Sequence, residues 1–209
     1  MTIFVIVLLL LILICLLLVY SYCKNDYQVY QNEQINDEML KEIRKLDEKF
    51  FDSEYLWEDD YQIQLFNKNK ESLIIVNYNN KLVGYLNYLV LTEEKYNEMI
   101  NSNITIDNFE IDEITSFYKN KNNYITINSI VIDKDFQNGD VIKCLTERLQ
   151  LILKQKNNDN YTISGMNAIA VSEDGRKALK NLGFEEQKCL DDGNYLYVLE
   201  GEKLKKYLV

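Results

Sequence analysis

Histidine and proline are both absent from the 209 residues of this chain. Without histidine, the chain cannot build a Ser-His-Asp triad, a Cys-His nucleophile pair or a histidine-ligated metal site. Basic residues are also few: 23 Lys and Arg stand against 33 Asp and Glu, which gives a net charge of −10. A protein that binds nucleic acid through its phosphates usually has the opposite balance, so we expect no nucleic-acid partner.

Cysteines are scattered rather than paired. Cys15 and Cys23 lie near the N-terminus, whereas Cys144 and Cys189 lie far apart in the rest of the chain. This spacing is neither a disulfide framework nor a CxxC metal pattern, so we expect no metal site. Cys23 is either a palmitoylation site or a spectator thiol.

The N-terminal segment is strongly apolar. Residues 3–20 contain no polar or charged side chain apart from one tyrosine hydroxyl. At about 1.5 Å per residue, the run and its flanks can cross a hydrocarbon core of about 30 Å. A cleaved signal peptide is the alternative, but no basic residue precedes the run and no small-x-small site follows it. We predict a transmembrane anchor at 1–22, and Lys24 favours a cytosolic C-terminal body.

Beyond a polar tether at 23–32, the hydrophobic pattern predicts one α/β domain at 33–209. Apolar residues at spacings of three and four predict two helices at the start of this domain. Trp57 and Tyr61 lie on the apolar side of the second helix. Extended apolar runs and turn residues predict the strands. The predicted order is helices at 35–50 and from 57, strands at 72–77 and 82–91, a helix at 92–100, a polar excursion at 101–123, a strand at 124–132, a helix at 141–154, a strand at 161–171, a helix at 172–182, and strands at 184–190 and 195–199.

Three short segments occur in a characteristic order along the chain. Lys81-Leu82-Val83-Gly84-Tyr85 opens the second strand of the first hairpin. Residues 130–139 form a strand and a loop that reads IVIDKDFQNG, and residues 168–184 contain AIAVS followed by ALKNLGF. This order resembles that of the GNAT superfamily, whose members are acyl-CoA-dependent N-acyltransferases. The resemblance covers residues 33–199, except the excursion at 101–123.

The resemblance implies a GNAT-like fold, which is a mixed, mostly antiparallel sheet with helices on both faces, preceded here by the transmembrane helix. It also implies acetyl-CoA, or another acyl-CoA, as co-substrate and an amine as acceptor. By resemblance, the strand at 130–132 offers its backbone to the cofactor, and the loop at 137–142 holds the pyrophosphate. The cofactor-binding candidates are therefore Ile130, Val131, Ile132, Gln137, Asn138, Gly139, Asp140, Val141 and Ile142.

The chain departs from the family pattern at three positions. Asp140 and Ile142 stand where the phosphate loop usually has small residues, and Leu179 stands where a tyrosine often protonates the leaving thiolate. Asp140 is either part of a working phosphate loop or only a helix cap whose carboxylate occupies the amides that a phosphate needs.

Catalytic candidates follow from the chemistry. The attacking amine must lose a proton, and the thioester oxygen needs a donor. Asn128 and Ser129 lie where family members often have a glutamate base, so a water relay is needed; their alternative is ordinary strand polarity. Ser172 replaces an asparagine and either donates a hydrogen bond or only caps a helix. Trp57 and Tyr61 either border the acceptor cleft or belong to the core.

Two functions therefore remain open. The first is a membrane-anchored N-acetyltransferase that acts on a primary amine, such as a cationic small molecule or a lysine side chain, which an acidic protein attracts. The second is a GNAT-fold binding or regulatory module that no longer binds acyl-CoA. A weaker third alternative makes the membrane segment the partner-binding element.

Overall fold

The computed structural model describes residues 27–51, 56, 59–102, 104 and 110–209. The predicted anchor at 1–22 and the candidate Trp57 lie outside these residues. Within them, no helix has both the length and the apolar character that a membrane crossing requires.

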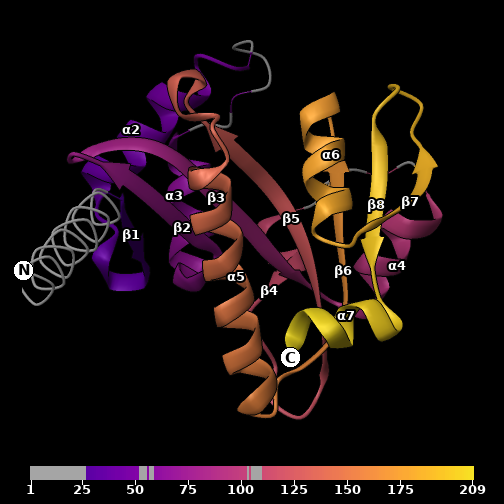
Figure 1. Ribbon diagram of the computed structural model, residues 1–209. Coiled ribbons are helices and arrows are strands. Elements are labelled where there is room, and N and C mark those ends of the chain that lie inside the picture. Colours follow the sequence, from indigo (N-terminus) through magenta and orange to yellow (C-terminus); the bar gives the residue numbers. More distant parts are fainter. Residues whose placement is uncertain (1–26, 52–55, 57–58, 103, 105–109) are drawn as a thin grey trace, which may run out of the picture.

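Strands and helices follow one another along the described chain in an order close to the predicted one (Figure 1). The strands are β1 (Tyr27–Gln31), β2 (Leu73–Tyr78), β3 (Lys81–Leu91), β4 (Ile114–Thr115), β5 (Asn122–Ile132), β6 (Thr162–Ala170), β7 (Glu185–Cys189) and β8 (Tyr195–Leu199). The α-helices are α2 (Asp37–Asp47), α3 (Asp59–Lys68), α4 (Glu93–Asn101), α5 (Asp140–Asn158), α6 (Glu173–Asn181) and α7 (Gly201–Leu208).

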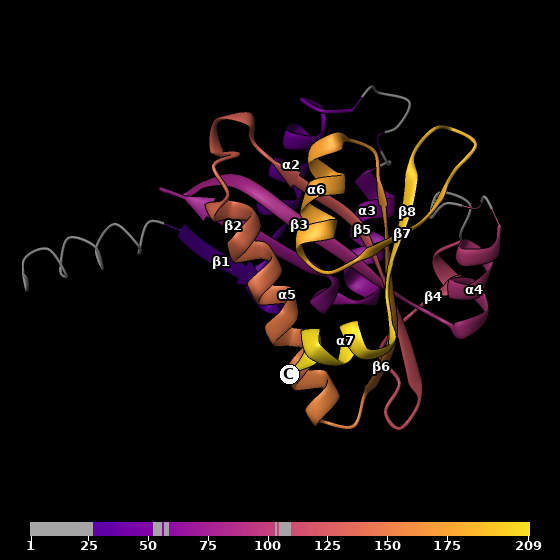
Figure 2. The same cartoon turned by 45° about the vertical axis from the view of Figure 1, so that its right-hand side comes forward.

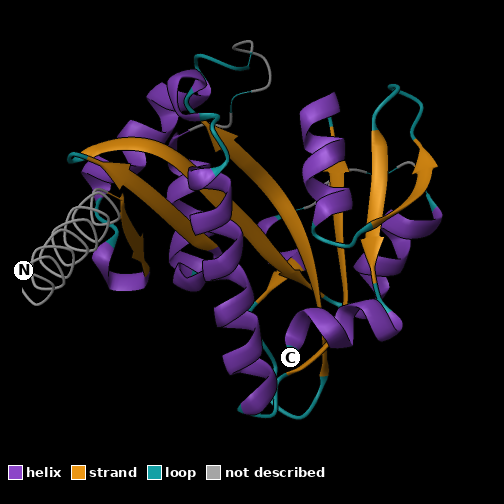
Figure 3. Cartoon of the chain, in the orientation of Figure 1, coloured by secondary structure: helices purple, strands orange, loops and turns teal. Residues whose placement is uncertain are grey.

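The strands form one sheet in the order β1-β2-β3-β5-β6-β8-β7, with β4 paired to β3. Only the β5–β6 pair is parallel among these pairs; the others are antiparallel. Helix α5 makes the crossover between the two parallel strands, which need a long connection. The expected mixed, mostly antiparallel sheet is confirmed (Figure 3).

Helices cover both faces of the sheet, with α5, α6 and α7 on one face and α2, α3 and α4 on the other (Figure 2). On the first face, Leu145, Leu149 and Leu153 of α5 are buried at helical spacing. On the second face, Leu40, Ile43 and Leu46 give α2 the same kind of stripe. The helical spacing of the sequence therefore identified the core-facing sides of both helices.

Three elements differ from the sequence-based expectation. One is the short strand β4, which pairs with β3 inside the polar excursion that was predicted at 101–123. Strand β1 forms within the predicted tether at 23–32, because its backbone pairs with the edge of β2 from Tyr27 opposite Tyr78 to Gln31 opposite Ile74. Helix α7 follows the last predicted strand and is held by Leu204, which is buried in the main core. Each element depends on a distant partner, so local sequence carries little signal for it.

Candidate active site

Strand β5 is paired with β6 over only about half of its length. The pairing runs from Asn122 opposite Thr162 to Ile127 opposite Ala168 and then stops. Strand β5 continues to Ile132 and β6 to Ala170, and the two strands diverge in this direction (Figure 1). The candidates Asn128, Ser129, Ile130, Val131 and Ile132 all lie in the stretch of β5 beyond the pairing. This edge of β5 is therefore the backbone available to an extended ligand.

A β-bulge bends β5 where the two strands part. Ser129 lies opposite Asn87 of β3 and Ile127 lies opposite Tyr88, so Asn128 is the extra residue. The side-chain amide of Asn128 donates to Asn87 Oδ1 at 3.1 Å and to Ser129 Oγ at 3.3 Å. The bulge thus brings three polar side chains together where the pairing of β5 and β6 ends, and the region between the unpaired ends of these two strands is called the cleft from here on. Sequence reasoning found Asn128 and Ser129 but missed Asn87, because its role depends on the register of β3.

A buried tyrosine and a buried carboxylate lie beneath this group. Tyr85 of β3 donates its hydroxyl to Asp47 Oδ1 of α2 at 2.6 Å, and both side chains are buried. Burial raises the pKa of Tyr85 well above its usual range, and the nearby Asp47 charge raises it further. Neither residue was a candidate, because in sequence Asp47 looks like one more charge on the exposed side of an acidic helix.

The loop after β5 ends in a glycine-capped helix. Gly139 occupies the N-cap of α5 with φ at 96°, a left-handed conformation that favours glycine. Asn138 Oδ1 accepts a hydrogen bond from the Asp140 amide at 3.1 Å, and Gln137 Nε2 donates to the Ile132 carbonyl at 3.3 Å. The alternative that Asp140 is the helix cap is wrong: Asp140 is the first helical residue, and its side chain is exposed. Of the other two loop candidates, Val141 is buried and Ile142 is half-buried.

Asp133 fixes the beginning of this loop. Its carboxylate is buried and binds Lys49 Nζ at 2.8 Å, with Lys81 Nζ at 3.8 Å. It also accepts a hydrogen bond from the Asp135 amide, and its own amide donates to the Val83 carbonyl. The hydrogen bond from Lys49 is the main reason why the pKa of Asp133 lies below its usual value. The loop is therefore anchored to the turn after α2 and to β3 before it reaches Gly139.

Gly84 lets α5 approach the sheet closely. A Cβ atom built on Gly84 would lie 2.8 Å from Val141 Cγ1 and 3.0 Å from the Val131 carbonyl oxygen. A larger residue would therefore push the first turn of α5 away from β3 and β5. This glycine belongs to the first of the three segments on which the family resemblance depends. The close approach of α5 explains why this segment has a glycine at position 84.

The opposite side of the cleft is the start of α6. Ser172 is the N-cap, and its hydroxyl accepts a hydrogen bond from the Gly175 amide at 3.0 Å. Leu179 is buried in the core beneath this helix. A cavity of about 160 Å³ lies between the start of α6 and the β7–β8 turn, and Arg176 stacks there on the Tyr195 ring at 4.0 Å. Of the two roles that the sequence allowed for Ser172, the structure shows the helix cap.

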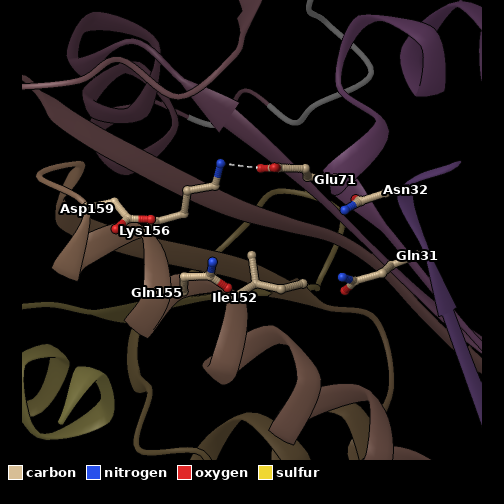
Figure 4. Close-up of a pocket in the computed structure, with 7 residues that line it drawn as sticks. All are labelled: Gln31, Asn32, Glu71, Ile152, Gln155, Lys156 and Asp159. Carbon is tan, nitrogen blue, oxygen red and sulfur yellow. Dashed lines mark ion pairs between the residues drawn. The ribbon is translucent and has the colours of Figure 1, made fainter.

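Tyr61 of α3 packs at the side of a small cluster formed by Leu65, Leu89 and Ile114. This placement corresponds to its core alternative. A second cavity, of about 260 Å³, lies near the C-terminal end of α5, where Lys156 binds Glu71 at 2.6 Å (Figure 4). Because Gly139 is at the other end of α5, this cavity is separate from the cleft. No cluster of metal-ligating side chains occurs among the residues described.

No protein-family model and no curated protein matches the sequence. Solved structures do match. The loading GNATL domain of CurA from Lyngbya majuscula is similar with a TM-score of 0.62 and 13% identity, over 83% of this chain and 97% of that one. NAA60 from Arabidopsis thaliana, bound to a bisubstrate analogue, gives 0.57 and 10%, over 82% and 96%. A chain of the NatC complex, bound to Gag peptide and CoA, gives 0.56 and 12%, over 84% and 99%. At these identities the matches show the fold, which is that of GNAT proteins.

Proposed function

We propose that this chain is an N-acetyltransferase that transfers the acetyl group of acetyl-CoA to a primary amine by direct attack. The observation that carries the proposal is the parting of β5 and β6 beside the glycine-capped start of α5. An extended pantetheine arm can pair with a free strand edge, and a helix N-terminus suits the pyrophosphate of the same ligand. The fold places these two features in succession along the chain.

Each part of the reaction has candidate residues in this cleft. The unpaired edge at Ile130, Val131 and Ile132 holds the pantetheine arm, and the loop from Gln137 to Ile142 holds the pyrophosphate. Backbone amides of the free edge stabilise the charge that develops on the thioester oxygen. The amine attacks the carbonyl carbon from the side of Asn128 and Ser129, and the CoA thiolate leaves.

Acyl-CoA as co-substrate is supported by the ligands of the similar structures. NatC was crystallised with CoA and a Gag peptide, and NAA60 with acetyl-CoA. These ligands favour a peptide amine as acceptor for this chain as well. The net charge of −10 favours a cationic amine, such as a lysine side chain or a polyamine.

The apolar N-terminal run supports membrane anchoring as a second part of the proposal, with the body in the cytosol. Residues 3–20 have the composition of a transmembrane helix, and β1 begins at Tyr27. The intervening residues can span only about 3.5 Å each, so the domain would lie close to the bilayer. Flotation of the full chain and of a chain without residues 1–22 with phospholipid vesicles tests this part. Equal flotation of both chains would contradict it.

A catalytically degenerate binding module is the alternative. Three observations favour it: Leu179 is buried and cannot donate a proton, Ser172 is occupied as a helix cap, and Asn138 occupies the Asp140 amide. In such a module the cleft would persist as a surface for another ligand, without turnover.

Acetyl transfer from radiolabelled acetyl-CoA tests the proposal against this alternative. The acceptors are a panel of peptides with free α-amines, lysine-containing peptides blocked at the α-amine, and polyamines. We expect label in at least one class and release of an equal amount of CoA thiol. S-acetylpantetheine, which lacks the pyrophosphate, should give a KM at least about tenfold higher because the α5 terminus then has no anion to bind. Absence of transfer to all three classes would favour the binding module.

A further inference from the structure

The Tyr85–Asp47 pair is an unusual feature for the inside of an α/β domain. Asp47 ends α2 and is only 4% exposed, and Tyr85 lies in the middle of β3 and is 5% exposed. The two residues are 38 positions apart in sequence, and their short hydrogen bond joins α2 to the sheet. A carboxylate loses much of its hydration on burial, so it needs strong donors. The Tyr85 hydroxyl is one such donor.

Ser129 connects this buried pair to the cleft. Ser129 lies opposite Asn87 and Tyr85 lies opposite Val131, so Ser129 and Tyr85 are diagonal neighbours on the same face of the β3–β5 pair. The Ser129 hydroxyl lowers the pKa of Tyr85, against the effect of burial. Ser129 itself is half-buried, so part of it is accessible to solvent. Its neighbour Asn128 donates to Ser129 Oγ at 3.3 Å, which fixes the orientation of the hydroxyl. The polar chain therefore runs from the cleft to a buried carboxylate.

The outer end of this chain lies at the point where the strands part. The last β5–β6 pair is Ile127 opposite Ala168, and Ser129 follows closely on β5. If acyl-CoA lies along the free edge, as the proposed function requires, its thioester lies near this point. The order of these groups suits the removal of a proton: Ser129 is the neighbour of Tyr85 on this face, and the Tyr85 hydroxyl donates to Asp47.

We propose that Ser129, Tyr85 and Asp47 form a proton relay that deprotonates the attacking amine; this inference rests on the proposed function. A bond forms between the amine nitrogen and the acetyl carbon, and the carbon–sulfur bond breaks to release the CoA thiolate. The amine proton passes to Ser129 Oγ, the serine proton to Tyr85 Oη, and the tyrosine proton to the Asp47 carboxylate. As the products leave, the proton returns from Asp47 through Tyr85 to Ser129 and from there through solvent to the thiolate. Ser129 is the catalytic residue, and the other two act through it.

A purely structural role for the pair makes different predictions. If Tyr85 and Asp47 only join α2 to β3, their substitution lowers stability and leaves chemistry unchanged in the folded enzyme. A relay instead lowers kcat, leaves the KM for acetyl-CoA unchanged and alters the solvent isotope effect, because exchangeable protons move in the chemical step. Tyr88 offers a matched control on the same strand. Its side chain is also buried, it lies on the opposite face of the sheet, and its hydroxyl has no hydrogen-bond partner.

The test uses the full-length chain and the most active amine of the acceptor panel, with Tyr85→Phe, Ser129→Ala, Ser129→Thr and Tyr88→Phe. We expect Tyr85→Phe and Ser129→Ala to lower kcat at least about tenfold with the KM for acetyl-CoA unchanged, and to reduce the solvent isotope effect on kcat. Ser129→Thr keeps the hydroxyl and should retain most of kcat. Tyr88→Phe should match the parent chain.

Each outcome decides the question. A parent kcat and isotope effect in Ser129→Ala would overturn the relay even if Tyr85→Phe failed to fold, because Ser129 is partly exposed and its loss disturbs little packing. Equal losses of kcat in Tyr85→Phe and Tyr88→Phe would also overturn the relay. A parent chain that transfers no acetyl group to any amine would overturn the proposed function and the relay with it. An active parent chain whose variants keep the parent kcat would overturn the relay alone.

Discussion

The two helices that border the cleft begin in opposite ways. Helix α5 has Gly139 at its N-cap, and no side chain is available from that position to bind the amides of the first turn. Helix α6 has Ser172, whose hydroxyl binds the Gly175 amide, and its first turn contains Glu173 and Asp174. An anion is attracted to free helix amides and repelled by neighbouring carboxylates. The first turn of α5 contains one carboxylate, Asp140, whose amide is bound by Asn138, whereas that of α6 contains two carboxylates and a serine cap. The difference supports the proposed pyrophosphate site at α5 rather than at α6.

Gly139→Asp should have the largest effect on this contrast. A Cβ at Gly139 meets nothing within 4 Å, so the new carboxylate can turn toward the first-turn amides and repel the pyrophosphate. We expect the affinity for acetyl-CoA to fall at least about tenfold in a calorimetric titration, or about 1.4 kcal/mol.

Gly139→Asn is the matched control, because it has the same backbone strain at φ of 96° without the charge. Equal losses in both variants would show that conformation, and not charge, controls binding at α5.

Ser172→Ala tests the other helix. The loss of the cap should lower the free energy of unfolding by about 1 kcal/mol in a denaturant titration, and the affinity for acetyl-CoA should not change. Ser172→Asp keeps a capping oxygen and should restore stability. A fall in kcat of the folded Ser172→Ala enzyme that persists in Ser172→Asp, although stability is restored, would instead give Ser172 a catalytic role.

The two helix starts also differ in their attachment, since only the α5 loop is fixed by Asp133. The lowered pKa of Asp133 means that its contribution to stability is present above the unfolded pKa, near 4, and is lost as pH falls through the lower folded value. Asp133→Asn should lower the free energy of unfolding at pH 7 by about 0.5 to 1 kcal/mol, because Lys49 is half-exposed. The difference between the variant and the parent chain should shrink below pH 4. A difference that stays constant from pH 7 to pH 2 would contradict this account.

Asp140→Asn should have the smallest effect, with the opposite sign. Its exposed carboxylate lies in the first turn of α5, so its removal should raise the affinity for acetyl-CoA about twofold to threefold. Asp174→Asn removes a first-turn charge from α6 and should leave the affinity unchanged. A gain of similar size in both variants would indicate a general charge effect and not a site at α5.

The sequence predicted the elements that form locally. The stripes of α2 and α5, the strands β2, β3 and β5 to β8, and the Ser172 cap all depend on residues within one or two turns of each other. The order of three short segments was enough to predict the fold. Strand β1 was missed because its partner, β2, is far away in sequence.

The candidate site was less predictable for the same physical reason. The bulge at Asn128 exists only in the register with β3, and the positive φ of Gly139 is not visible in a loop that also contains Asp140. The pairing of Tyr85 with Asp47 joins two elements through the core. A buried acidic residue at the end of an amphipathic helix looks like any exposed one until its partner is known.

Titration of the full-length chain with acetyl-CoA in an isothermal calorimeter tests the central claim most directly. The account predicts one saturable site per chain, with heat that weakens in Gly139→Asp and persists in Ser172→Ala. No heat and no shift in thermal unfolding at millimolar acetyl-CoA would contradict it.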